Sequence, residues 1–187
     1  MVRVVDKHSA SLWAWECLQD PDTLILDTET TGLGSDAEIV QIAIINLRGD
    51  VLIDTLVKPS GIIPDEASAI HGITLKTVER EPTFDQIAEQ VRALLGRKMC
   101  LIYNTNYDVR LLQQSADAVG ISTFKTQFAR FQCVMLPYSA WVGEPGRSRG
   151  EYRWQRLPGG DHSALGDCRA VRRVLFKMAS LEWLCDR

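Results

Sequence analysis

The chain has 187 residues, of which 45% are hydrophobic, and a formal net charge of −3 at pH 7. A chain of this size can bury one substantial core and is too short for two comfortable domains, so we expect a single domain over residues 1–187. Its acidic balance excludes a global positive field that attracts nucleic acid or acidic membranes, so a polyanion would have to be held by a local basic patch or through metal ions.

The cysteines and the apolar segments indicate the compartment. Five cysteines lie far apart, without a CxxC pair or a cysteine–histidine cluster, so the sequence predicts neither a zinc site nor a disulfide framework. Isolated cysteines of this kind are typical of a reducing compartment. No apolar run has the length of a signal peptide or of a membrane span. We therefore expect a cytoplasmic protein that makes no membrane contact.

The N-terminal part predicts one helix followed by three strands. Ser9 is a candidate cap for a short helix that ends at Asp20-Pro21. Residues 1–21 are thus expected to form a helical extension before a core over residues 22–180. The expected strands are 24–28, 38–47 and 51–57, of which the last two form a hairpin.

The rest of the chain alternates between helices and strands. Residues 58–82 form a long excursion with short helical pieces, and residues 143–161 form a loop rich in Gly, Pro and Arg. The other expected elements are a helix from Thr83 to Gly96, a strand at 99–103, a helix at 107–119, a strand at 128–134 and a helix at 163–179. This order predicts an α/β fold, with a mixed β-sheet flanked by helices.

Four acidic side chains are expected to face the interior. Asp27 and Glu29 point the same way because alternate residues of a strand share a face. At helical spacing, Asp108 lies on the face of Leu111, and Asp167 lies on the face of Val171.

Burial of these acids calls for a compensating charge. A lone buried carboxylate costs several kcal/mol unless it is paired, protonated or bound to a cation. No lysine or arginine lies on the same faces, so a hard divalent ion such as Mg²⁺ or Mn²⁺ is the natural partner. Each acid alone could instead be a helix cap, a satisfied internal group or an edge position, but four together favour a metal site.

Three motifs in order carry a family resemblance. They are DTETTG at 27–32, NTNYD at 104–108 and HSALGD at 162–167, with IHGIT at 70–74 between the first two. With these motifs the chain resembles the DnaQ-like 3′-5′ exonucleases, of the polymerase III epsilon-subunit and RNase T type, from about residue 24 to residue 179. The resemblance implies an RNase H-like fold and metal-dependent hydrolysis of nucleic acid from a 3′ end to nucleoside 5′-monophosphates.

The resemblance also implies roles for the charged motif residues. Asp27, Glu29 and Asp167 would bind two Mg²⁺ ions, which Mn²⁺ can replace, and Asp108 would complete the site. Glu29 and His162 would be the catalytic residues. His162 stands five residues before Asp167, which marks the DEDDh subtype, and it would accept the proton of the attacking water. The alternative for His162 is a cap of the last helix.

A further set of residues is implied in substrate binding. Thr30, Thr31 and Gly32 would bring the backbone close to the terminal sugar, and Leu33 would pack against the last base unless it belongs to the core. Glu66 and His71 match family positions that meet the terminal nucleotide, and a surface role is their alternative. The full implied set is Thr30, Thr31, Gly32, Leu33, Glu66, His71 and Asn104.

Two features depart from the family pattern. The second motif begins Tyr103-Asn104-Thr105 where the family usually has His-Asn-Ala. The loop over residues 147–156 contains Arg147, Arg149, Arg153, Arg156, Tyr152 and Trp154. This loop is a candidate basic, aromatic patch for a single strand, and an ordinary solvated loop is the alternative.

The main functional hypothesis is a 3′-5′ exonuclease that acts on DNA. The same chemistry on RNA, in an RNase T or oligoribonuclease-like enzyme, is the close alternative, and a noncatalytic polymerase-associated subunit is a third. The expected partners are single-stranded nucleic acid 3′ ends and the nucleoside monophosphate product. Since the chain stops soon after the last expected helix, we expect a monomer or homodimer without a polymerase-docking tail.

Overall fold

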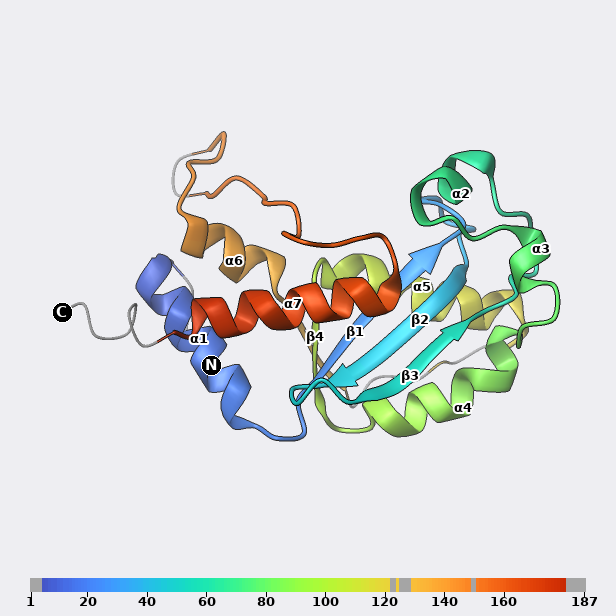
Figure 1. Ribbon diagram of the computed structural model, residues 1–187, viewed down its shortest axis with the longest axis horizontal. Coiled ribbons are helices and arrows are strands. Elements are labelled where there is room, and N and C mark those ends of the chain that lie inside the picture. The colour runs from blue at the N-terminus through green and yellow to red at the C-terminus, as the bar shows by residue number, and fades with distance from the viewer. Residues whose placement is uncertain (1–4, 122–123, 125–128, 149–150, 181–187) are drawn as a thin grey trace.

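A mixed five-stranded sheet organises the protein. The computed structural model describes residues 5–121, 124, 129–148 and 151–180. The strand order is β3-β2-β1-β4-β5; β2 is antiparallel to β1 and β3, whereas β1, β4 and β5 are parallel (Figure 1). The strands are β1 Leu24–Thr30, β2 Ile39–Asn46, β3 Val51–Leu56, β4 Met99–Ile102 and β5 Arg130–Cys133.

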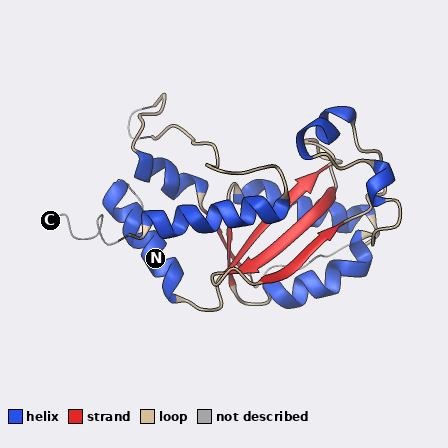
Figure 2. Ribbon diagram, in the orientation of Figure 1, coloured by secondary structure: helices blue, strands red, loops and turns tan. Residues whose placement is uncertain are grey.

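Helices cover both faces of this sheet (Figure 2). One face packs against α1 Lys7–Gln19, α6 Met135–Val142 and α7 Ala164–Met178, and the other packs against α4 Phe84–Leu95 and α5 Thr105–Ala118. The short helices α2 Asp65–His71 and α3 Leu75–Val78 belong to the excursion after β3. The predicted α/β class with a mixed, helix-flanked sheet is confirmed.

Strand β1 explains why acids stand at the end of an apolar run. Leu24 and Leu26 face the α4–α5 layer, whereas Ile25 faces the α1–α7 layer, so the first half of the strand is apolar on both sides. Beyond residue 26 the strand leaves the two cores. The start of α5, which directly follows the neighbouring strand β4, and the start of α7 both approach this end of the sheet (Figure 1).

The predicted N-cap at Ser9 is wrong. Helix α1 begins earlier, and Asp6 is its cap, with an Asp6 Oδ1 that accepts from the Ser9 N–H at 2.8 Å. Ser9 takes the third helical position, where its hydroxyl accepts from the Asp6 N–H at 3.0 Å. Both residue types favour a cap, and the reciprocal bonds of this capping box decide between them.

Helix α6 was not predicted from the sequence. Pro137 lies within the first turn of α6, where a proline is tolerated. Most side chains of α6 are buried, so the segment shows no helical alternation of polar and apolar residues. Strand β5 confirms the last predicted strand over 130–133, while residue 128 and Arg149 lie outside the described residues. In the part of the chain that the structure describes, no helix has the length and apolarity that crossing a membrane requires.

Candidate active site

The four predicted acids meet at the carboxyl end of β1. Asp27 and Glu29 come from β1, Asp108 from the first turn of α5 and Asp167 from the first turn of α7. Burial, and then the negative charges of Asp108, Asp167 and Glu29, raise the pKa of Asp27 well above its ordinary value. Each acid therefore lies within the electrostatic reach of the others, although 140 positions separate the first from the last.

Burial also raises the pKa values of the neighbouring carboxyls. Burial, followed by the charges of Asp167 and Asp108, raises the pKa of Glu29 to about 7. Burial raises the pKa of Asp108 to about 7, although the Thr28 hydroxyl, which donates to Asp108 Oδ1 at 2.8 Å, opposes this rise. Burial also raises the pKa of Asp167. Without a cation, the four carboxyls cannot all be ionised near neutral pH.

The donor set fits a hard divalent cation. Within the described residues none of the four acids takes part in an ion pair. Protein groups fix two of them, because Thr28 donates to Asp108 and the Asp161 N–H donates to Asp167 Oδ1 at 2.9 Å. One ligand atom from each of Glu29, His162 and Asp167 lies within 4.8 Å of the other two. Carboxylate oxygens of this kind suit Mg²⁺ or Mn²⁺ better than softer metals.

His162 projects at the open side of the acids. Its side chain is exposed, and its backbone takes the left-handed conformation with φ 59°. The alternative role as a helix cap is wrong, since Ser163 caps α7 by accepting from the Gly166 N–H at 3.1 Å. Asp161 in turn accepts from the Ser163 N–H at 3.1 Å. The imidazole is thus left for contacts at the acids.

We call residues 151–162 the approach segment. Its hydrogen bonds to the rest of the fold hold its last residue, His162, in place. The Tyr103 hydroxyl donates to the Gln155 carbonyl at 2.9 Å, and Arg173 donates to the Gly159 carbonyl at 3.0 Å. The Asp161–Asp167 bond closes the segment onto α7. Tyr103, which replaces the usual histidine of the second motif, therefore anchors the segment that precedes His162.

A cavity of about 530 Å³ lies beside the acids. It contains all seven residues expected to contact substrate, together with Glu29 and Tyr107. Leu33 is 81% exposed, so the alternative that it belongs to the core is wrong. The seven are Thr30, Thr31, Gly32, Leu33, Glu66, His71 and Asn104.

His71 is more than a surface residue of this cavity. Its Nδ1 accepts from the Ile73 N–H at 3.0 Å, so Nε2 carries the proton and donates to the Thr30 carbonyl at 3.1 Å. Burial, and to a lesser extent the nearby His162, lower the pKa of His71. A neutral imidazole therefore joins α2 to the end of β1.

Helix α5 clamps the loop that carries Leu33. The Tyr107 hydroxyl donates to the Gly32 carbonyl at 2.7 Å, and Arg110 donates to the Leu33 and Gly34 carbonyls at 3.3 and 2.9 Å. Gln114 adds bonds to the Gly34 and Ala37 carbonyls at 3.2 and 2.9 Å. These bonds fix an exposed leucine in space. The polar residues at 107, 110 and 114 share one face of the helix, which is a signal in the sequence, but the sequence does not name the loop that they contact.

Comparisons with known proteins agree with this geometry. A family model of RNase T type, described as Exonuclease, matches residues 24–175. The chain is 40% identical over 174 residues to the uncharacterized exonuclease CP81 of Escherichia phage 186, a match that covers 86% of this chain and 89% of that protein. The chain belongs to the RNase T-type exonuclease family.

Solved structures confirm the RNase H-like exonuclease fold. Exonuclease X in complex with 5′ overhanging duplex DNA matches with a TM-score of 0.57 and 26% identity, over 88% of this chain and 98% of that chain. E. coli Exonuclease I with a dA16 oligonucleotide matches with a TM-score of 0.65 and 16% identity. That match covers 87% of this chain and 42% of the Exonuclease I chain, so the similarity to the latter concerns the fold of one part of it.

The raised pKa values predict how the stability of the metal-free protein depends on pH. A carboxyl whose pKa is raised by folding stabilises the folded state fully below its unfolded pKa of about 4, and this stabilisation is lost as pH rises through the folded value. For Glu29 and Asp108 that value is about 7. We expect the Tm in chelator to fall by several degrees between about pH 5 and about pH 8, as calorimetry would measure.

Two comparisons make this measurement specific to the acids. Mn²⁺ should raise the Tm more at the higher pH, because the cation and the protons compete for the same oxygens. Asp108→Asn should flatten the pH slope, since it removes one buried titrating group. An unchanged slope in this variant would contradict the assignment.

The clamp on the Leu33 loop predicts a local effect. Arg110→Ala removes two bonds to loop carbonyls, at a cost of about 1 kcal/mol in local opening. Hydrogen exchange should then quicken roughly fivefold at the Thr31 and Glu38 amides, which are bonded across this loop. Arg80→Ala, at an exposed position, is the control. Equal exchange in both variants would show that Arg110 does not hold the loop.

Proposed function

We propose that the protein is a metal-dependent 3′-5′ exonuclease of the DEDDh subtype that removes nucleoside 5′-monophosphates from the 3′ end of single-stranded DNA. One observation carries the proposal. His162 and the two acids Glu29 and Asp167 lie together at the open edge of a four-carboxylate cluster, next to a cavity of about 530 Å³. The cluster can organise a phosphodiester, and the cavity can hold the terminal nucleotide.

Asp27, Glu29, Asp108 and Asp167 would hold two divalent ions, with Mg²⁺ as the expected metal. When bound, these ions supply Lewis-acid stabilisation of the charge that develops on the phosphoryl and leaving oxygens. The acids themselves also favour bound cations, since burial and then the neighbouring negative charges raise the pKa values of Asp27 and Glu29.

The side chains of the site have separate tasks in this proposal. His162 accepts the proton of the attacking water, whose oxygen forms a bond to the terminal phosphorus. The bond from phosphorus to the 3′ oxygen of the preceding nucleotide breaks. That oxygen takes a proton from solvent, and the released nucleotide keeps the 5′ phosphate. His162 is suited to this task because it is exposed and helix capping by Ser163 leaves its ring unengaged.

The cavity would orient the terminal nucleotide. Leu33 offers an apolar surface to the last base, and its loop is fixed by α5, so little ordering is left to occur on binding. Contact of this kind ignores base identity, as an enzyme that digests any sequence requires. The similarity to Exonuclease X, a structure determined with DNA, favours DNA over RNA as the substrate.

A time course on oligonucleotides labelled at the 3′ or the 5′ end tests polarity, sugar and metal together. We expect a ladder from the 3′ end of DNA, nucleoside 5′-monophosphate as the product, slower cleavage of matched RNA, and no cleavage in chelator. Digestion from the 5′ end would overturn the proposal. Preferred digestion of RNA would transfer the same chemistry to an exoribonuclease.

Replacement of His162, the proposed general base, gives a second test. His162→Ala should lower kcat by about 10²- to 10⁴-fold, because the attacking water loses its proton acceptor. DNA affinity measured with Ca²⁺ should change little. His8→Ala on α1 is the matched control and should keep the wild-type rate. A His162 variant that is as active as this control would exclude the assigned role.

A further inference from the structure

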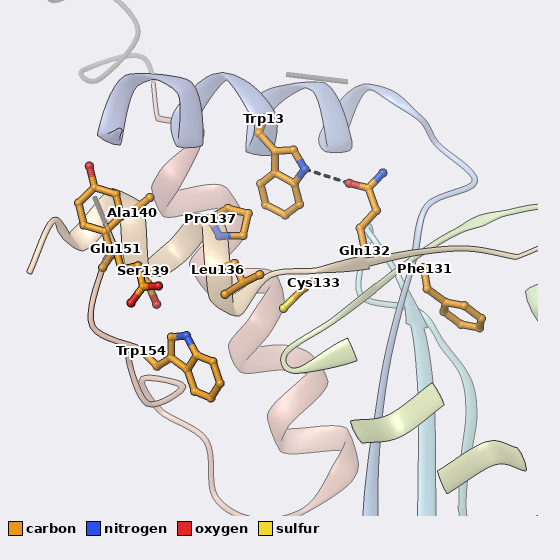
Figure 3. Close-up of a pocket in the computed structure, with 11 residues that line it drawn as sticks. Trp13, Phe131, Gln132, Cys133, Leu136, Pro137, Ser139, Ala140, Glu151 and Trp154 are labelled. Carbon is orange, nitrogen blue, oxygen red and sulfur yellow. Dashed lines mark hydrogen bonds between the residues drawn. The ribbon is translucent and has the colours of Figure 1, made fainter. Parts of the chain in front are cut away.

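A second cavity, of about 730 Å³, has no lining residue in common with the cavity beside the acids. Its walls come from α1, β5, α6 and the start of the approach segment (Figure 3). The lining residues that matter for its chemistry are Trp13, Leu136, Pro137, Tyr152 and Trp154. No part of the proposed catalytic cycle uses this cavity.

The β5 residues that line the cavity, Phe131 to Cys133, are level with Leu24 to Leu26 on β1, directly before the acids. Ile25 pairs with Leu101, which pairs with Gln132, so Asp27 on β1 and Val134 after β5 stand at the same level. The strands β1, β4 and β5 are neighbours and parallel, and two strand spacings amount to about 10 Å. A strand of nucleic acid whose 3′ end is in the active site therefore needs only a few nucleotides to reach the second cavity.

The approach segment connects the two places. It carries Trp154 at the cavity and His162 at the acids, eight residues apart in sequence, which limits their Cα separation to about 29 Å. Its backbone is fixed close to Trp154, because Gln155 donates to the Ser139 hydroxyl at 3.3 Å and accepts from the Tyr103 hydroxyl at 2.9 Å. The position of Trp154 relative to the catalytic groups is thus set by the fold.

The cavity offers aromatic surface without a hydrogen-bonding code. Trp154 is 69% exposed and Leu136 is 53% exposed, and both line the cavity, so they present apolar surface to an occupant. The most prominent polar pair of the wall is already satisfied, since the Trp13 indole N–H donates to Gln132 Oε1 at 2.9 Å (Figure 3). Such a surface suits the face of a nucleobase of any identity.

Charge decides between a nucleobase and an apolar peptide as the occupant. Arg153 and Arg156 flank Trp154, and Arg147 precedes the segment; all three side chains are exposed. Arg153 pairs with Glu144, but Arg147 and Arg156 form no ion pair within the described residues. A nucleotide within a strand, with a phosphate on either side of its base, matches these arginines around an aromatic side chain. Glu151 on the wall is the one acidic residue among the described residues that line the cavity.

We propose that this cavity is an upstream base site, in which Trp154 stacks on a nucleobase of the substrate strand several nucleotides before its 3′ end. The proposal rests on the proposed exonuclease function and adds a second point of contact to it. It predicts that affinity depends on strand length, because oligonucleotides that reach Trp154 bind better than those that fill only the active site.

The test is the dependence of kcat/KM on length for oligo-dT of two to twelve nucleotides. For wild type, kcat/KM should rise with length and then level off. Trp154→Ala should lower the value for the long oligomers about tenfold, which corresponds to the loss of one stacked base. The shortest oligomers should be cleaved at the wild-type rate. Trp15→Ala, at an exposed position outside the cavity, should behave as wild type throughout.

Separate outcomes distinguish this proposal from the proposed function. A Trp154→Ala enzyme with the full length dependence of wild type would overturn the upstream site and leave the exonuclease intact, and the cavity would then be open to a protein partner. If wild type cleaves nothing, the exonuclease proposal fails. Anisotropy with labelled dT12 in Ca²⁺ then decides alone: a tenfold loss of affinity in Trp154→Ala supports the site, and equal affinity overturns it.

Discussion

Burial of four neighbouring carboxylates, and then the repulsion between them, dominates the electrostatics of this site. Asp27 is partly buried with three further acids within electrostatic reach, and its pKa lies well above the ordinary range. In the metal-free protein, folding therefore forces protons onto groups that would be ionised in water, which opposes folding near neutral pH. A cation reverses the sign of this effect, because the same oxygens then share a positive partner. On the proposed function, the chain retains an arrangement that is unfavourable without cations and becomes favourable when they bind.

The topology reduces the repulsion before any ion arrives. Asp108 and Asp167 each lie in the first turn of a helix, where the partial positive charge of the free N–H groups favours an anion by about 0.3 to 1 kcal/mol. Both helix starts lie beside β1 because β1 is central: parallel β4 leads into α5 on one side, and α7 packs across β1 and antiparallel β2. A carboxylate pair on an edge strand would have only one such neighbour.

Alternation along strands and periodicity along helices were enough to predict the mixed sheet and the inward direction of the four acids. Elements without a periodic pattern were not predictable this way, and α6, with buried residues on all sides, is the clearest case. Contacts between distant segments were equally out of reach. The bonds from Arg110 to the Leu33 loop join residues more than 70 positions apart, and nothing local to either segment requires them. The choice of Asp6 over Ser9 as a cap depended on bond geometry, which composition does not encode.

The net charge of −3 has a different meaning once the site is placed in space. Repulsion between the acids and a phosphate chain is strongest within about 10 Å, beyond which salt screens it at physiological ionic strength. The exposed arginines near Trp154 stand on the segment that leads away from the acids, so on the proposed function a strand would gain favourable contacts there while its 3′ end lies at the anionic cluster. Attraction is thus local and directional instead of global. Such an arrangement would favour strands long enough to reach both regions, and it would let a protein of net negative charge act on a polyanion without binding polyanions in general.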